Sequence, residues 1–86
     1  MKTAMTVSAQ VAIYPLRQPR LGPAVEAVQQ ALRDHGLHPE PGPMNTYVVG
    51  DDTEIFAALQ DAFAHVSKLG HVVMTVTVSN ACPIPD

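Results

Sequence analysis

Alternating apolar and polar positions predict a β-strand near each end of the chain. From Met5 to Pro15 every second residue is apolar, and the bulkier set falls on one side: Val7, Ala9, Val11 and Ile13. From His71 to Ser79 or Asn80 the same period sets one apolar row apart from a mixed row: Val72, Met74, Val76 and Val78 against Val73, Thr75, Thr77 and Ser79. Each strand therefore has one face suited to a core.

Two segments between these strands have the apolar spacing of helices. The first runs from Pro23 to about His35, and Gly36 follows where a C-terminal cap glycine belongs. Asp51 or Asp52 is predicted to cap the second helix, with Glu54 in a capping-box relation to Asp51. Its expected buried stripe has six members: Ile55, Leu59, Ala62, Phe63, Val66 and Leu69.

The segment between the helices contains three prolines and predicts two further strands. Leu37–Glu40 is expected as a short edge strand, because proline cannot donate to the ladder of a central strand. Pro41, Gly42 and Pro43 have the composition of a turn. Met44 to Gly50 is expected as a second, better strand.

The order of the elements is β-α-β-β-α-β, without an internal repeat or linker. Short connections and right-handed crossovers then predict an α+β, ferredoxin-like βαββαβ fold: a four-stranded antiparallel sheet with two helices on one face. We expect one domain over residues 1–86, with its core at about 5–83. The apolar strand faces should lie under the helices, and the other face is expected to carry Ser8, Gln10, Ala12, Tyr14, Val73, Thr75, Thr77 and Ser79.

Composition and charge narrow the class of protein. Hydrophobic residues make up 47% of the 86 residues, which is too high for a disordered chain. The net charge of −3 without a basic cluster argues against a nucleic-acid partner. A single cysteine excludes an intrachain disulfide, no signal peptide is recognised, and no apolar run reaches the ~18 residues of a transmembrane helix. We therefore expect a cytoplasmic protein that does not insert into membranes.

The predicted open sheet face is unusual because it carries short hydroxyl side chains and no charge. Only 15% of the residues are charged, and Thr75, Thr77 and Ser79 stand where a solvated sheet usually has charged side chains. Such a face suits a second sheet or a flat polar ligand. We expect a homodimer or homotetramer, joined by sheet faces or by edge strands. The alternative is a solvated face that is rich in threonine because of its β-propensity.

Three segments resemble a known family: Ser8–Leu16, Met44–Asp51 and Gly70–Pro83. They are similar to the YkoF family of thiamine and hydroxymethylpyrimidine binding proteins, which is related to the MTH1187-like proteins. The resemblance covers about Thr6 to Pro83. It implies the ferredoxin-like fold and non-catalytic, cofactor-free binding of thiamine through its pyrimidine half, in uptake or salvage. The family's namesake carries two such domains in tandem, so two copies of this chain would have to associate to recreate that arrangement.

Site candidates follow from matching these segments to the open face. Gln10 and Asn80 each hold a donor and an acceptor in one plane, which matches the edge of an aminopyrimidine. The hydroxyls of Ser8 and Thr46 can donate or accept, and Tyr47 or Tyr14 can stack on the ring. The expected ligand-binding residues are Ser8, Gln10, Thr46, Tyr47, Asn80 and Cys82. No catalytic residue and no metal ligand is expected.

Other interpretations of single residues are weaker. Cys82 as a nucleophile lacks a neighbouring base in sequence, and a small turn or pocket-lining cysteine is commoner. The four histidines are not at ligand spacing on one helix face, so exposed histidines are favoured over a metal site: His35, His38, His65 and His71. Helix capping explains Asp51 and Asp52 better than acid–base chemistry does. The loop residues Arg17 and Arg20 are either solvated or contact a phosphate on the ligand.

Three classes of function therefore remain open. The first is a binding module for thiamine or hydroxymethylpyrimidine. The second is an oligomeric regulatory or assembly domain whose open face serves only as an interface. The third is a small ferredoxin-like dimeric enzyme, for which the sequence offers no acid–base pair.

Overall fold

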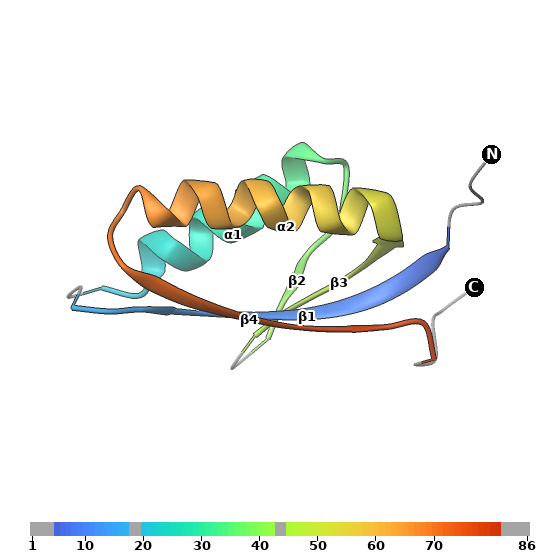
Figure 1. The fold of residues 1–86 in the computed structure, drawn as a ribbon, viewed down its shortest axis with the longest axis horizontal. Coiled ribbons are helices and arrows are strands. Elements are labelled where there is room, and N and C mark those ends of the chain that lie inside the picture. Colours follow the sequence, from blue (N-terminus) through green and yellow to red (C-terminus); the bar gives the residue numbers. More distant parts are fainter. Residues whose placement is uncertain (1–4, 18–19, 43–44, 82–86) are drawn as a thin grey trace.

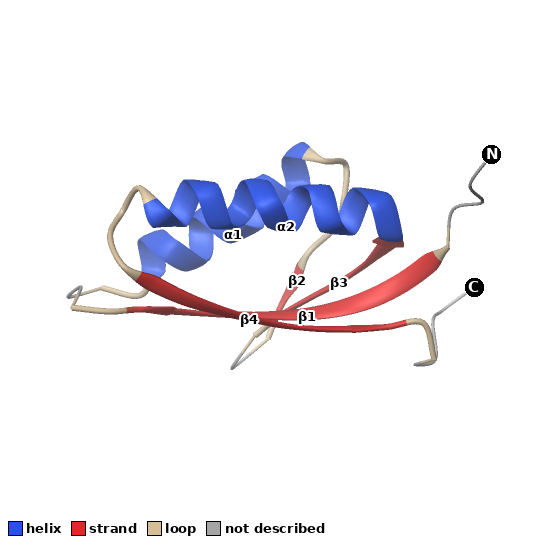
Figure 2. Cartoon of the chain, in the orientation of Figure 1, coloured by secondary structure: helices blue, strands red, loops and turns tan. Residues whose placement is uncertain are grey.

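The computed structural model describes residues 5–17, 20–42 and 45–81. In chain order the elements are β1 (Thr6–Pro15), α1 (Gly22–Asp34), β2 (Glu40–Pro41), β3 (Thr46–Asp51), α2 (Asp52–Ser67) and β4 (Val72–Ser79). The strands form one sheet in the order β2-β3-β1-β4, and every neighbouring pair is antiparallel. Both helices cover the same face of this sheet (Figures 1 and 2). The predicted α+β, ferredoxin-like fold is confirmed.

The core lies between the helices and the inner face of the sheet, as the strand periodicity predicted. Val7, Ala9, Val11 and Ile13 of the central strand β1 are all buried. Val72, Met74 and Val76 of β4 are half-buried and pack against the same core. Val78 faces the same side, opposite Ala9, but is exposed, contrary to expectation. Since β4 is an edge strand, its side chains are covered from one side only.

Both helices form, and the stripe predicted for α2 is partly wrong. Ile55, Leu59, Ala62 and Val66 are buried, and Ala58, which the prediction omitted, is buried as well. Phe63 and Leu69 are exposed instead. Phe63 follows the buried Ala62 directly, and one residue turns a side chain by about 100° around the helix axis. Leu69 lies beyond Ser67, where α2 ends.

The first of the two strands between the helices begins at Glu40, three positions after the predicted start at Leu37. Leu37 is buried in the core, and a Cβ on Gly50 would lie 2.6 Å from Leu37 Cδ2, so the side chain of Leu37 lies against the backbone of β3. The chain therefore joins the sheet only at β2, where Glu40 pairs with Tyr47. Thr46 begins β3, whereas Met44, the expected start, lies outside the described residues.

The two aspartates at the start of α2 do not act as predicted. Asp51 occupies the N-cap position, but its side chain makes no capping hydrogen bond. Asp52 is buried; its Oδ1 accepts a hydrogen bond from the Met5 backbone nitrogen at 3.2 Å. The backbone N–H of Asp52 donates to the Met5 carbonyl at 2.8 Å. These two hydrogen bonds connect the start of β1 to the start of α2.

Within the described residues, no helix has the length and apolarity needed to cross a membrane.

The cap glycine after α1 provides a test of the backbone geometry. Gly36 has φ +77°, a left-handed conformation that costs a residue with a Cβ about 1–2 kcal/mol. We expect Gly36→Ala to lower the free energy of unfolding in urea by about that amount. Gly22→Ala is the control, because nothing lies within 4 Å of a Cβ at Gly22 and its φ is not left-handed. Equal stability of the two variants would contradict the assigned cap.

Candidate functional site

A groove of about 490 Å³ lies between α1 and the inner face of the sheet, at the end of β1 that is farthest from Met5. This volume falls within the range of pockets that bind small molecules. The residues that line it come from β1, α1, the residue before α1, and the β2–β3 hairpin: Val11, Ala12, Ile13, Tyr14, Pro15, Leu21, Val25, Val28, Gln29, Pro41, Gly42, Asn45 and Thr46. Most of them are apolar, and four carry amide or hydroxyl groups: Tyr14, Gln29, Asn45 and Thr46.

Strand pairing explains why the sheet is open at this place. On one side β1 pairs with β4 as far as Pro15. On the other side its pairing with β3 ends at Val11, opposite Thr46. The chain from β2 turns back to β3 through Gly42, whose N–H donates to the Asn45 carbonyl at 2.6 Å. The last residues of β1 therefore extend beyond the hairpin, and α1 lies above the gap.

Three polar side chains in the groove are not engaged by the rest of the described chain. Thr46 is only 5% exposed, Gln29 and Asn45 are half-buried, and none of them makes a side-chain hydrogen bond to another described residue. Within the described residues, no fully buried side-chain polar atom lacks a partner. The Thr46 hydroxyl therefore keeps some access to the groove. Because unpaired polar groups at an apolar wall favour a polar ligand, this groove is the candidate site.

The residues expected to bind ligand on the open face are placed differently. Gln10 is exposed there, opposite Tyr47 on β3 and Thr77 on β4. Ser8 faces the same side but is buried. Asn80 follows β4 and points its Nδ2 at Met5 Sδ, 3.5 Å away. Asn80 lies three positions after Thr77, the residue opposite Gln10, which corresponds to on the order of 10 Å along a strand.

Neither the groove nor a second, smaller hollow is lined by Ser8, Gln10 or Asn80. Tyr47 lines a second hollow of about 310 Å³ beside His38, Glu40 and two valines of β3. The expected grouping of Thr46 with the open face is wrong: Thr46 pairs with Val11, so its side chain lies on the helix side and lines the groove. Cys82 lies outside the described residues. The roles of all six expected residues in ligand binding stay predictions: Ser8, Gln10, Thr46, Tyr47, Asn80 and Cys82.

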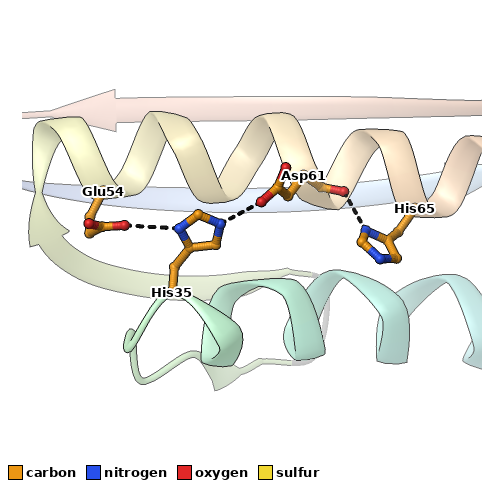
Figure 3. A network of polar contacts seen from close by, with 4 residues as sticks. All are labelled: His35, Glu54, Asp61 and His65. Carbon is orange, nitrogen blue, oxygen red and sulfur yellow. Dashed lines mark hydrogen bonds and ion pairs between the residues drawn. The ribbon is translucent and has the colours of Figure 1, made fainter.

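A cluster of polar side chains joins the two helices. His35 follows α1 and places its Nδ1 2.9 Å from Glu54 Oε1 and its Nε2 2.6 Å from Asp61 Oδ2, as Figure 3 shows. A neutral imidazole has one N–H, so both contacts are donated only by the protonated ring. The hydrogen bonds to Asp61 and then to Glu54 raise the pKa of His35 above 6.5. Sequence patterning treated this residue as an exposed histidine.

The same cluster does not form a metal site. His65 directs its Nδ1 at the backbone carbonyl of Asp61, 2.8 Å away, not at the shared centre (Figure 3). Among the described residues, no group of three or more His, Cys, Asp or Glu side chains is arranged to hold a metal ion. The contacts of His35 with Glu54 and Asp61 connect the end of α1 to α2, and we call these three residues the helix clamp.

Comparisons with known proteins agree with this fold. The model of the YKOF-related family matches residues 6–85. A hypothetical protein from Methanocaldococcus jannascii is 26% identical, with a TM-score of 0.77 over 86% of this chain and 78% of that one. A Thermotoga maritima protein named for thiamine biosynthesis or salvage is 20% identical (TM-score 0.75; 85% and 81% covered). A Streptococcus pneumoniae protein is 19% identical (TM-score 0.79; 87% and 86%). No curated protein matches the chain.

The helix clamp predicts a pH dependence of stability. Because folding raises the pKa of His35, its stabilising contribution is fully present below pH 6.5 and is lost as the pH rises through the higher folded value. We expect His35→Gln to lower the melting temperature clearly at about pH 5.5 and much less at about pH 9. His38→Gln is the control, because His38 is exposed and lies outside the cluster. A His35→Gln effect that stays constant with pH would contradict the clamp.

Proposed function

The chain belongs to the YKOF-related family, and from this membership we propose that it binds thiamine, or the hydroxymethylpyrimidine part of thiamine, without catalysing a reaction. The name of the Thermotoga maritima protein, which refers to thiamine biosynthesis or salvage, supports a thiamine-related role. The resemblance of the strand segments to thiamine-binding proteins points the same way. In this proposal the protein acts in the cytoplasm, in uptake or salvage of the pyrimidine, and needs no cofactor.

The observation that carries the proposal is the groove with its unengaged polar groups. An aminopyrimidine has ring nitrogens that accept hydrogen bonds and an exocyclic amine that donates them. The amides of Gln29 and Asn45 offer both donor and acceptor, and the Thr46 hydroxyl can do either. The apolar walls formed by Val11, Ile13 and the α1 valines suit the faces of a flat ring. We therefore assign the ligand to the groove.

The character of the lining favours binding over catalysis. Among the described residues that line the groove, Tyr14 is the only one with a titratable side chain. General acid–base catalysis near neutral pH uses His, Asp, Glu, Lys or Cys in most cases, and none of these lines the groove in the described chain. The neutral lining also suits the uncharged pyrimidine half of thiamine better than a phosphate group.

The open sheet face is the alternative location for the same ligand. Gln10 is exposed there without a side-chain hydrogen bond to another described residue, so its amide is available as well. Asn80 lies near one end of that face, in contact with Met5. Substitutions in the groove and on the open face separate the two locations.

Calorimetric titration with thiamine and with hydroxymethylpyrimidine tests the proposal. Gln29→Leu and Thr46→Val each leave a ligand group without its partner, which costs about 1–3 kcal/mol, so we expect each to weaken binding by roughly ten- to a hundredfold. Gln60→Leu is the matched control, because Gln60 is an exposed helical glutamine outside the groove. It should bind as the parent does.

Other outcomes of the same titrations would contradict the proposal in distinct ways. If Gln10→Leu and Asn80→Ala lose affinity while Gln29→Leu and Thr46→Val keep it, the ligand binds on the open face. If the folded parent binds neither thiamine nor hydroxymethylpyrimidine, the proposed function is wrong, and a regulatory or assembly domain becomes the better hypothesis.

A further inference from the structure

The connection between β1 and α1 joins the two walls of the groove at one end. Pro15, the last residue of β1, and Leu21, the residue before α1, both line the groove. Arg17 follows Pro15 by two positions, and Arg20 directly precedes Leu21. In Figure 1 the end of β1 and the start of α1 lie next to each other at the left of the molecule. The two arginines therefore lie at this end of the groove, which we call the outer end.

The polar side chains of the groove lie toward its other, inner end. Thr46 is paired with Val11, the first groove residue of β1, whereas Pro15 is the last. At about 3.3 Å per residue, Val11 and Pro15 are roughly 13 Å apart along the strand. α1 returns over the sheet from the outer end, and Gln29 lies eight residues after Leu21, or about 12 Å along the helix. A ring bound to Thr46 and Gln29 therefore leaves the outer part of the groove to its substituents.

Both arginines at the outer end are without an ionic partner in the described part of the chain. Arg17 and Arg20 are exposed, and neither makes an ion pair or a side-chain hydrogen bond to another described residue. Arg33 differs, because its guanidinium lies 3.3 Å from the carboxylate of Glu26. No acidic side chain lines the groove among the described residues, and positions 16–21 contain none. In a chain with a net charge of −3, this end of the groove is thus positively charged.

The start of α1 adds to this positive character and leaves space beside it. The first turn has no acidic residue, and the N-cap Leu21 makes no side-chain capping hydrogen bond. The partial positive charge of the helix N-terminus is therefore not neutralised by a side chain of that turn. A Cβ on Gly22 would meet nothing within 4 Å, so the space beside the helix start is open.

We propose that the ligand of this groove is a phosphate monoester of the pyrimidine alcohol, with the ring at the inner end and the phosphate beside Arg17 and Arg20. This inference rests on the proposed function, because it takes the pyrimidine to be bound in the groove. A phosphate monoester carries a charge of about −1.5 to −2 at pH 7 and has three strong acceptor oxygens. A guanidinium group binds two such oxygens through parallel hydrogen bonds.

The distribution of charge also determines the orientation of the ligand. The described lining of the groove holds no cation, so a phosphate inside it would lose hydration without gaining a charged partner. At the outer end the phosphate keeps contact with water and meets both arginines. The free alcohol has no group that can make these contacts. Arg17 and Arg20 therefore act as specificity-determining residues that select the ester over the alcohol.

Calorimetric titration with hydroxymethylpyrimidine and with its phosphate monoester tests the proposal. We expect the parent to bind the ester roughly tenfold or more tightly than the alcohol, which corresponds to one charge-assisted contact. Arg17→Gln and Arg20→Gln should each reduce this preference by roughly threefold or more, and the double variant should abolish it. Arg33→Gln is the matched control, because it removes the same charge from a side chain outside the groove. Circular dichroism melting checks the fold, which we expect to be intact because Arg17 and Arg20 are exposed.

The possible results separate this proposal from the proposed function. Equal affinity of the parent for ester and alcohol would overturn the proposal and leave the proposed function intact. A preference for the ester that survives in the double variant, or that Arg33→Gln reduces equally, would also overturn it. Binding of neither ligand by the folded parent would overturn both. Binding of the ester alone, lost in the double variant, would support the proposal and restrict the proposed function to the phosphorylated ligand.

Discussion

The placement of both helices on one face of the sheet is the constraint on which the rest of this structure depends. Each helix connects parallel strands that are not neighbours, and the handedness of such connections brings both helices to the same side. β1 then lies at the centre, with four apolar side chains buried beneath the helices. The sheet is left with a face that has no helix on it and with an edge at β4.

The carboxylates of α2 lie away from the groove. His35 holds Glu54 and Asp61 between the helices, and Asp52 is turned inward against Met5. The described lining of the groove contains no acid or base apart from Tyr14. The groove to which we assign the ligand is thus neutral, which fits an uncharged pyrimidine.

Sequence patterning predicted the strand faces and the order of elements, because alternation reports directly which side chains a sheet buries. It failed where burial depends on neighbours in space. Phe63 was assigned to the core of α2, but the buried stripe lies further round the helix, so that it includes Ala58 and leaves Phe63 exposed. Leu37 was assigned to a strand, but its side chain is drawn against Gly50.

The site was harder to predict than the fold. The side on which Thr46 lies depends on the register between β1 and β3, and this register is not visible in either strand alone. The groove arises because β1 continues to Pro15 after its pairing with β3 has ended at Val11. Gln29 and Gln30 are neighbours in the first predicted helix, and nothing in the sequence distinguishes Gln29, which lines the groove, from Gln30, which does not. Such features depend on the tertiary arrangement, not on local periodicity.

The central claim is that the ligand occupies the groove between α1 and the sheet. The most direct measurement follows the backbone amide signals of ¹⁵N-labelled protein by NMR during titration with hydroxymethylpyrimidine. Our account predicts saturable shifts concentrated at Val11, Gln29, Asn45 and Thr46, with little change at Gln10, Thr77 and Asn80. Shifts concentrated at the latter three residues, or no saturable shift at all, would contradict it.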